Sequence, residues 1–208
     1  MSATVVVEAP AKVNLLLGVG TARADGYLES GYRLTRFLSL AWEPAMPLEG
    51  FRDYVDDPSA RGGQFDLRLG VARHLSLGLS SSWHWFAQNF DQKTVEYPDA
   101  AVTAAVYDRA QFITLRATLH WYLIDGPVQP YVGIGAGGVW YDAHRTVAGA
   151  SETWSGFSVA GDPQVGLLWT IGPGLALHLA ARYQFTLASF AGVENASYAV
   201  VSAGIAVY

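Results

Sequence analysis

Five histidines are the side chains of this sequence best suited to metal binding or general-base catalysis. They are His74, His84, His120, His144 and His178. Neutral imidazole ligates metals, and its pKa of about 6.5 suits proton transfer near neutral pH. Metal sites often show a paired pattern such as His-Glu-x-x-His, and neither that pattern nor any close pairing occurs here. The histidines therefore favour hydrogen-bonding roles over a metal centre.

A serine hydrolase is the second chemistry to weigh, because Ser80, Ser81 and Ser82 lie just before His84. The Gly-x-Ser-x-Gly turn that presents the nucleophile in many hydrolases is absent. The chain also has no cysteine, which excludes disulfides, thiolate metal sites and a cysteine nucleophile. We therefore expect no catalytic residues, no metal and no cofactor.

The composition indicates contact with lipid. Apolar residues make up 51% of the 208 residues and charged residues only 15%, whereas soluble domains average about 25% charged residues. A net charge of −5 without a basic stripe argues against a nucleic-acid partner. No run of about 18 apolar residues occurs, so a membrane-spanning helix is not expected. A closed β-barrel is the other structure that satisfies the backbone in lipid.

A two-residue alternation of apolar and polar side chains places the residues discussed above on strands. Phe65, Leu67 and Leu69, for example, alternate with Asp66 and Arg68. The same alternation predicts eight strands, at about residues 32–43, 63–73, 74–87, 110–123, 129–142, 155–170, 174–188 and 197–208. Soluble strands usually have about five or six residues, whereas a tilted strand needs about 9–11 to cross a bilayer. The strand lengths therefore favour a membrane barrel.

The connections between these strands alternate in length. Short turns are expected near residues 73–74, 124–128 and 171–174, and longer polar links at 44–62, 88–109, 143–154 and 189–196. Short turns on one rim and long loops on the other are typical of outer-membrane barrels. We expect loops 44–62 and 88–109 to be the sites for an extracellular or envelope protein partner. The first is acidic, with Glu49, Asp53, Asp56 and Asp57, and is expected to be a solvated loop that could bind a cation or a partner.

The two faces of the strands indicate which side meets lipid. A midplane arginine on the lipid face of a barrel costs about 2–4 kcal/mol, so the ionisable face must point to the lumen. The expected polar network of the lumen consists of Asp66, Arg68, His84, Arg116, His120, His178, Arg182 and Gln184. Eight strands leave an interior that side chains can fill. The predicted fold is all-β: an eight-stranded antiparallel up-and-down transmembrane β-barrel with an apolar lipid-facing exterior and a polar, filled lumen.

Aromatic residues cluster near the ends of the predicted strands. Trp and Tyr prefer the headgroup level of a bilayer, where one end of the side chain is apolar and the other is wet. The expected aromatic girdle consists of Trp42, Trp83, Trp85, Trp121, Tyr122, Trp140, Tyr141 and Trp169. The alternative interpretation is ordinary aromatic packing in the core of a soluble sandwich.

From about residue 32 on, the chain resembles the small outer-membrane β-barrel proteins of the OmpA/OmpW type. The resemblance rests on the rhythm of strands and loops, on the segment PVQPYVGIGAGGVWYD (Pro127 to Asp142) and on the aromatic final residue, Tyr208. The family usually ends in phenylalanine. The resemblance implies a porin-like transmembrane protein of the Gram-negative envelope, located in the outer membrane with the lipid bilayer as its partner.

The first 31 residues do not fit this barrel. The segment Ala9 to Tyr27 is similar to the amino terminus of 4-diphosphocytidyl-2-C-methylerythritol kinase, a small-molecule kinase of the GHMP type, through its Pro-Ala-Lys-x-Asn phrase at residues 10–14. Leu28 stands where that family has histidine, and the glycine-rich phosphate loop that holds ATP has no counterpart. We expect a fused, misassembled or mis-started fragment without catalytic competence.

A poor signal peptide is the other interpretation of this segment. A short apolar stretch, Val13 to Gly20, follows Lys12, and Ala22-Arg23-Ala24 is similar to an A-x-A cleavage site. The sequence does not by itself assure export.

Three functions follow from these patterns. The first is an integral outer-membrane protein of structural, adhesion or envelope-interaction type, without catalysis, that presents its loops for interaction. The second is a narrow transporter for small hydrophobic molecules. The third is a small-molecule kinase fragment, which nucleotide binding would reveal.

Overall fold

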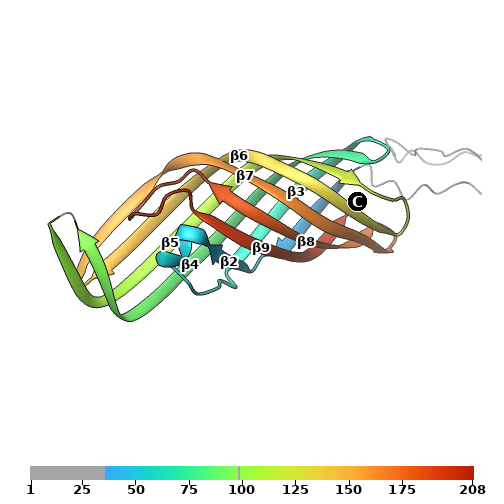
Figure 1. The fold of residues 1–208 in the computed structure, drawn as a ribbon. Helices are drawn as coiled ribbons and strands as arrows, with labels where there is room; N and C mark the ends of the chain where they lie inside the picture. Colours follow the sequence, from blue (N-terminus) through green and yellow to red (C-terminus); the bar gives the residue numbers. More distant parts are fainter. Residues whose placement is uncertain (1–35, 98) are drawn as a thin grey trace, which may run out of the picture. The chain divides into compact units, whose positions relative to one another are not determined.

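Antiparallel strands form a ring in the computed structural model, which describes residues 36–97 and 99–208 (Figure 1). The strands are β1 (Arg36–Trp42), β2 (Ala45–Leu48), β3 (Gly62–Ala72), β4 (Leu75–Tyr97), β5 (Ala100–Tyr122), β6 (Val128–Val147), β7 (Ala150–Gly172), β8 (Leu175–Thr186) and β9 (Ser197–Val207), with a 3-10 helix η1 (Glu49–Asp53) after β2. No described helix is long and apolar enough to cross a membrane. The interpretations of residues 1–31 and the start of the first predicted strand lie outside the described residues.

The ring closes because β1 pairs with both β3 and β9. Strands β1 and β2 occupy one position in the ring, since both pair with β9 in one continuous register, from Leu38 opposite Val207 to Leu48 opposite Ser197. The wall therefore contains eight strand positions, all antiparallel. This confirms the predicted eight-stranded antiparallel barrel.

Apolar side chains cover the outside of the wall, and ionisable ones lie within it. Leu67, Leu115 and Leu179 are 45%, 55% and 47% exposed. Arg68 and Arg116, one residue away from the first two, are each 1% exposed. Because successive side chains of a strand point to opposite faces, these values confirm the apolar exterior and the polar, filled lumen.

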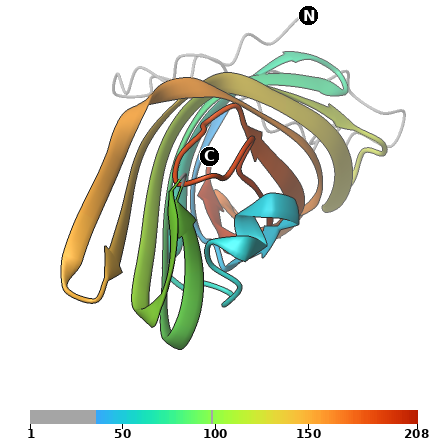
Figure 2. The same ribbon diagram turned by 60° about the vertical axis from the view of Figure 1, so that its left-hand side comes forward.

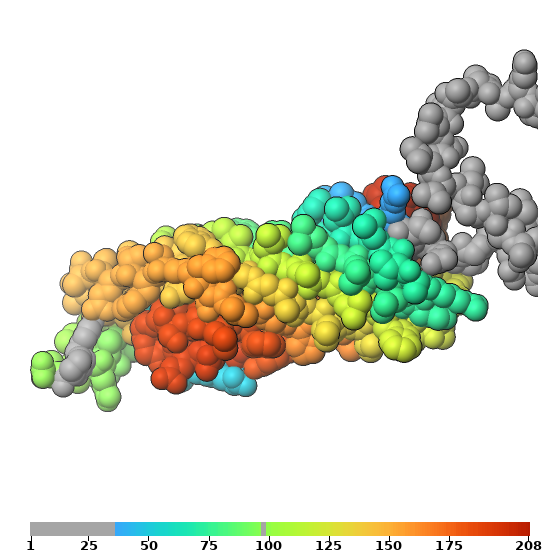
Figure 3. All heavy atoms as spheres, turned by 90° about the horizontal axis from the view of Figure 1, so that it is seen from above, coloured from blue at the N-terminus to red at the C-terminus, as the bar shows by residue number. Residues whose placement is uncertain are grey.

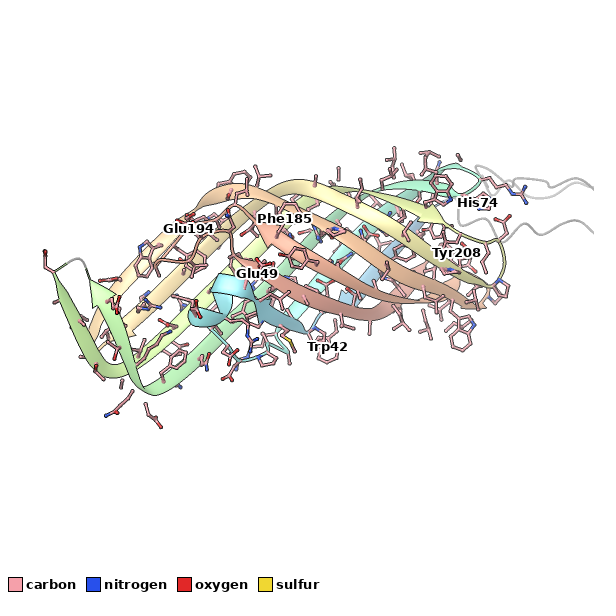
Figure 4. The ribbon with its side chains drawn as sticks, viewed as in Figure 1. Trp42, Glu49, His74, Phe185, Glu194 and Tyr208 are labelled. Carbon is pink, nitrogen blue, oxygen red and sulfur yellow. The ribbon has the colours of Figure 1, made fainter. Side chains whose placement is uncertain are left out.

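The two ends of the barrel differ. At the short-turn end, brief connections at residues 73–74, 123–127 and 173–174 join the strands. His74 and the final residue, Tyr208, lie at this end, and Glu49 and Glu194 lie toward the other, which we call the extended end (Figure 4). The C-terminus is fixed by Tyr208, whose hydroxyl donates to the carbonyl of Gly172 at 3.2 Å.

At the extended end, two predicted loops are wrong. Residues 88–109 and 143–154 are mostly strand: β4 and β5 continue to a tight turn near residue 99, and β6 and β7 to a turn at Ala148 and Gly149. Both turn residues have positive φ, 48° and 87°, as two-residue hairpin turns require. Apolar and polar residues do not alternate in these segments, because the charged Asp108 and Arg145 share the buried face with Val106 and Val147.

The continuations of β4 to β7 form what we call the outer sheet, residues 85–97, 100–110, 143–147 and 150–159. The pairing of β4 with β3 ends at His84, and that of β7 with β8 at Ala160. Beyond these residues the four strands continue to pair with one another and project from the barrel (Figure 2). On the surface, the segment around Phe190 lies against this part of β7 (Figure 3), where the Leu187 amide donates to the carbonyl of Val159 at 2.9 Å.

Candidate functional site

The lumen near the short-turn end contains a buried ion pair. Arg68 Nε lies 2.8 Å from the carboxylate of Asp66, and both side chains are 1% exposed. The same guanidinium donates to the hydroxyls of Thr118 at 2.9 Å and Ser76 at 3.3 Å. Strands β3, β4 and β5 supply these groups from their inward positions. The arginine is thus paired and hydrogen-bonded, as burial of a charge requires.

A second buried ion pair lies in the lumen over the inward face of β6. Arg116 of β5 lies 2.7 Å from the carboxylate of Asp162 on β7 and donates to Gln184 of β8 at 2.9 Å. It also contacts Ser80 and Ser82 at 3.3 and 3.4 Å. These serines therefore serve the arginine, and Ser82 also hydrogen-bonds Thr114 at 2.6 Å.

A third arginine completes the lumen network. Arg182 donates to the carboxylate of Glu43 and to the side-chain oxygen of Gln64. Glu43 also accepts from Ser202 at 2.6 Å and lies 3.2 Å from His84 Nε2. Three buried arginines thus face three buried carboxylates, those of Asp66, Asp162 and Glu43. The three arginines and three carboxylates of the network therefore balance in formal charge.

Two of the network's acids, Asp162 and Glu43, are not among the residues expected in it. Asp162 stands at an inward position of β7, and the parity of Val159 and Val165 on the outward face predicts this position. Glu43 is the last residue of the predicted strand 32–43, where alternation with Trp42 puts its side chain on the polar face.

Glycines on β6 make room for the network. The Pro-Tyr-x-Gly-x-Gly-x-Gly phrase places Gly133, Gly135 and Gly137 on the inward face. A Cβ at Gly135 would lie 2.1 Å from the carboxylate of Asp162, and one at Gly137 would lie 2.0 Å from the carbonyl oxygen of Leu115. The phrase is therefore a packing requirement of a narrow, filled lumen.

The three inward histidines are distributed along the lumen. His120 stacks on Tyr131 with ring centroids 4.1 Å apart, and the Tyr131 hydroxyl lies 2.7 Å from His178 Nε2. His84 belongs to the Glu43 group. No group of three His, Asp or Glu side chains in the described chain is arranged to hold a metal ion.

The other two histidines lie away from the lumen. His74 is near Asp125 at the short-turn end, 3.8 Å apart, and His144 contacts Thr153 at 2.8 Å on the outer sheet.

A cap closes the lumen at the extended end. It consists of residues 44–61, including η1, and inserts Phe51, Tyr54 and Val55 into the barrel mouth, where all three are fully buried. The Phe51 ring contacts those of Phe86 and Phe112, with centroids 5.1 and 5.5 Å away. The rings of Phe190 and Tyr198 lie at 6.2 and 6.4 Å. The expectation of a solvated loop is wrong for these residues, because their apolar side chains fill the mouth. The acidic groups of the segment stay exposed.

Hydrogen bonds fasten the cap to the outer sheet. The Tyr54 hydroxyl lies 3.0 and 2.7 Å from the carbonyl oxygens of Arg109 and His144. Burial raises the pKa of Tyr54 above its ordinary value, so the hydroxyl remains a donor. Lys93 donates to the carbonyl of Asp53 at 2.6 Å and lies 3.0 Å from the carboxylate of Asp108.

Six of the eight residues expected in the aromatic girdle lie on the outer wall. Trp42, Trp83 and Trp140 form an upper row, since Gly63 pairs with both Trp42 and Trp83, and Ile113 with both Trp83 and Trp140. Trp121 and Trp169 lie nearer the short-turn end, and Trp85 lies two residues beyond Trp83.

The prediction that Tyr122 and Tyr141 belong to the girdle is wrong. Tyr122 is 9% exposed and lies inside, 3.4 Å from Ser76, because it is one residue from the outward Trp121. Tyr141 is likewise one residue from the outward Trp140, and its ring stacks on that of Phe190 with centroids 5.7 Å apart. Alternation decides the side, and an aromatic residue at a strand end does not escape it.

The outer wall also carries a hollow at the extended end. Its volume is about 650 Å³, and it lies between residues 57–61 of the cap and strands β4 and β5. Trp85 and Tyr107 are its aromatic residues.

Comparison with known proteins identifies the fold. No family model matches the chain, and no curated protein matches it. The crystal structure of Neisserial surface protein A (NspA) is similar, with a TM-score of 0.55 at 14% identity over 83% of this chain and 96% of that one. That of Ail, the attachment invasion locus protein of Yersinia pestis, gives 0.51 at 15% over the same shares. The described chain thus has the fold of the small eight-stranded outer-membrane β-barrels.

Proposed function

We propose that this protein is an integral protein of a bacterial outer membrane, in which the barrel is the anchor and the extended end is an interaction surface. The observation that carries the proposal is a band of outward side chains without charge. On β5, every outward residue from Ile113 to Trp121 is apolar, and polar Gln111 and Arg109 follow beyond it. The segment from residue 113 to residue 121 is nine residues long, which is about the length that a tilted strand needs to cross the hydrocarbon.

The filled lumen supports anchoring over transport. Arg68, Arg116 and Arg182 are paired with carboxylates within it, and the cap fills its mouth with aromatic rings. Passage of a solute would require these buried pairs to part, and a buried charge that loses its partner costs several kcal/mol. The narrow transporter for hydrophobic molecules is therefore the weaker alternative.

The partner surface consists of the cap and the outer sheet. The acidic groups of the cap, among them Asp53, Asp56 and Asp57, are exposed, and the outer sheet extends four strands beyond the wall. A rigid scaffold that presents variable outer segments is a common way to build a binding surface. The name of Ail as an attachment invasion locus protein is consistent with an attachment role for such a surface.

We also propose that the barrel domain comprises residues 32–208 and that residues 1–31 are no part of it. Ring closure supports this, because β1 already has β3 and β9 as neighbours and leaves no free edge for a further strand. A chain that begins at Tyr32 should then refold in detergent as completely as the full chain. Failure of the shorter chain to fold would refute this boundary.

Electrophoresis and protease protection together test the membrane assignment. The purified protein, refolded in detergent, should migrate differently on a detergent gel before and after boiling. In outer-membrane vesicles, added protease should cut the cap or outer sheet and leave the strands of the band intact. Identical migration with and without boiling, together with digestion of the whole chain, would contradict the proposal.

A further inference from the structure

The hollow on the outer wall has the size of a small-molecule site. Its volume of about 650 Å³ falls within the range of about 300–1,000 Å³ that such sites occupy. It lies outside the barrel, so neither the lumen network nor the cap core fills it. Trp85, Tyr107, Gln88 and Asn89 supply its side from β4 and β5, and Asp57 and Arg61 supply the side of the cap.

The aromatic part of the hollow is held in place. The Trp85 amide donates to the carbonyl of Arg61 at 2.9 Å, and the Ser59 hydroxyl donates to the carbonyl of Trp85. The guanidinium of Arg109 lies 5.0 Å from the centroid of the Trp85 ring. Ala87, also in the lining, stands on the same face between Trp85 and Asn89, and Asn89 pairs with Tyr107. The small alanine therefore leaves space between two aromatic side chains.

The polar part of the hollow supplies both donors and acceptors. Gln88 accepts hydrogen bonds from the amides of Asp56 and Asp57 through its side-chain oxygen, which orients the amide group and keeps its nitrogen available. Asn89 is exposed and can donate or accept. Asp57 and Arg61 have opposite charges, so the lining carries no net charge.

These features together select a ligand class. Asp57 would repel an anion and Arg61 a cation, and a purely apolar ligand would leave the amides of the lining without partners, which is costly. A pyranose ring satisfies both parts, because its C–H faces stack on aromatic rings and its hydroxyls both donate and accept. We propose that this hollow binds a neutral sugar ring, from a soluble glycan or from the headgroup of a membrane glycolipid.

The location agrees with both sources. Trp85 lies two residues beyond Trp83 of the upper aromatic row, so the hollow opens just outside the apolar band. This step rests on the proposed function, because only a barrel seated in a bilayer puts the hollow at the membrane surface.

Binding measurements on the refolded full chain test the proposal in two arms. In the first, saturation-transfer NMR and calorimetry use the methyl glycosides of glucose, galactose and mannose with the protein in a zwitterionic detergent. In the second, nanodiscs contain the alkyl glycosides of the same sugars. The variants are Trp85→Ala, which removes the platform, and Ala87→Leu, which fills the space. Trp83→Ala is the matched control, since Trp83 points outward on the same strand.

We expect at least one of the sugars to bind in at least one arm. Trp85→Ala and Ala87→Leu should weaken that binding about tenfold or more, the loss expected for one aromatic contact, while Trp83→Ala leaves it unchanged. Binding in the first arm identifies a soluble glycan as a source, and binding in the second arm alone identifies a glycolipid. No binding in either arm, or equal binding by the Trp85→Ala variant, would overturn the proposal. Heat-modifiable migration of the same samples tests the membrane assignment separately.

Discussion

Arg116 and Asp162 approach to 2.7 Å inside the barrel, and each side chain is 1% exposed. They come from β5 and β7, which flank β6 in the wall. Their contact therefore passes over the inward face of β6, where side chains would be in the way. Gly135 and Gly137 leave that face free of side chains. The glycines of β6 therefore make room for the ion pair between its two neighbouring strands.

Breaking this pair should destabilise the barrel strongly. Asp162→Ala leaves the guanidinium of Arg116 without its carboxylate, and loss of one partner of a buried pair costs about 3–5 kcal/mol. Urea unfolding of the refolded protein in liposomes, followed by tryptophan fluorescence, measures the change. The double variant Arg116→Met/Asp162→Leu should recover much of the loss, because no unpaired charge remains at that position. Equal stability of the single variant and the parent would show that the pair is not formed.

The band on the outer wall predicts a position-dependent cost for a new charge. Leu115→Arg should reduce the free energy of unfolding by about 2–4 kcal/mol, the cost of arginine at the midplane of a barrel's lipid face. Tyr107→Arg is the matched control, because Tyr107 points outward on the same strand but lies beyond the band. It should change stability by less than about 1 kcal/mol. If the two variants lose similar free energy of unfolding, residues 107 and 115 share one environment, which would contradict the apolar band.

The cap predicts a cavity when its central ring is removed. Phe51→Ala should cost about 3–5 kcal/mol, since the ring is fully buried among Phe86, Phe112 and others. Benzene should restore part of the loss, because apolar cavities of this kind stay dry and bind it. Phe157→Ala is the control, since Phe157 is 77% exposed on the outer wall. If Phe51→Ala is as stable as Phe157→Ala, the cap does not fill the mouth.

The glycines of β6 predict a folding defect from one added methyl group. In Gly137→Ala the new Cβ would lie 2.0 Å from the carbonyl oxygen of Leu115, a backbone atom that cannot move aside alone. The refolded fraction, read as the heat-modifiable band on a gel, should fall sharply. Gly63→Ala should refold normally, because its nearest neighbour would lie 3.5 Å away. Normal refolding of both variants would contradict the close approach of β5 and β6.

The filled lumen predicts low permeability. Liposomes that contain the refolded protein should not swell in isotonic arabinose at the rate of liposomes that contain a general porin, because paired side chains occupy the interior. A stable, porin-sized current in a planar bilayer would contradict the arrangement of Arg68, Arg116 and Arg182.

The sequence was sufficient for the barrel where alternation was strong. Within the band, an apolar exterior and a polar interior make neighbouring residues opposite in character, as at Leu67 and Arg68. Outside the band, charged Asp108 and Arg145 share the buried face of the strands with Val106 and Val147, so the periodic signal is lost and the pattern predicts loops.

The rest of the site depends on tertiary packing that a pattern does not encode. Phe51, Tyr54 and Val55 lie in a segment whose charges predict a solvated loop. They are buried because they fill the mouth of the barrel, which the sequence of this segment does not show. Alternation along strand 32–43 puts Glu43 on the polar face, but only the packed lumen shows that Arg182, Ser202 and His84 meet it there. Tyr122 and Tyr141 were misplaced because a composition rule for aromatic residues was applied where parity decides.

Spin labels on β5 test most directly which side chains of the wall face outward. The chain has no cysteine, so each single-cysteine variant carries the label at one known position. Labels at residues 107 to 121 in liposomes would be probed with oxygen, which partitions into lipid, and with a water-soluble nickel complex. The account predicts high oxygen and low nickel access at 113, 115, 117, 119 and 121, high nickel access at 107, and little access to either at the even positions. High nickel access at 115 and 117, or no alternation along the strand, would contradict it.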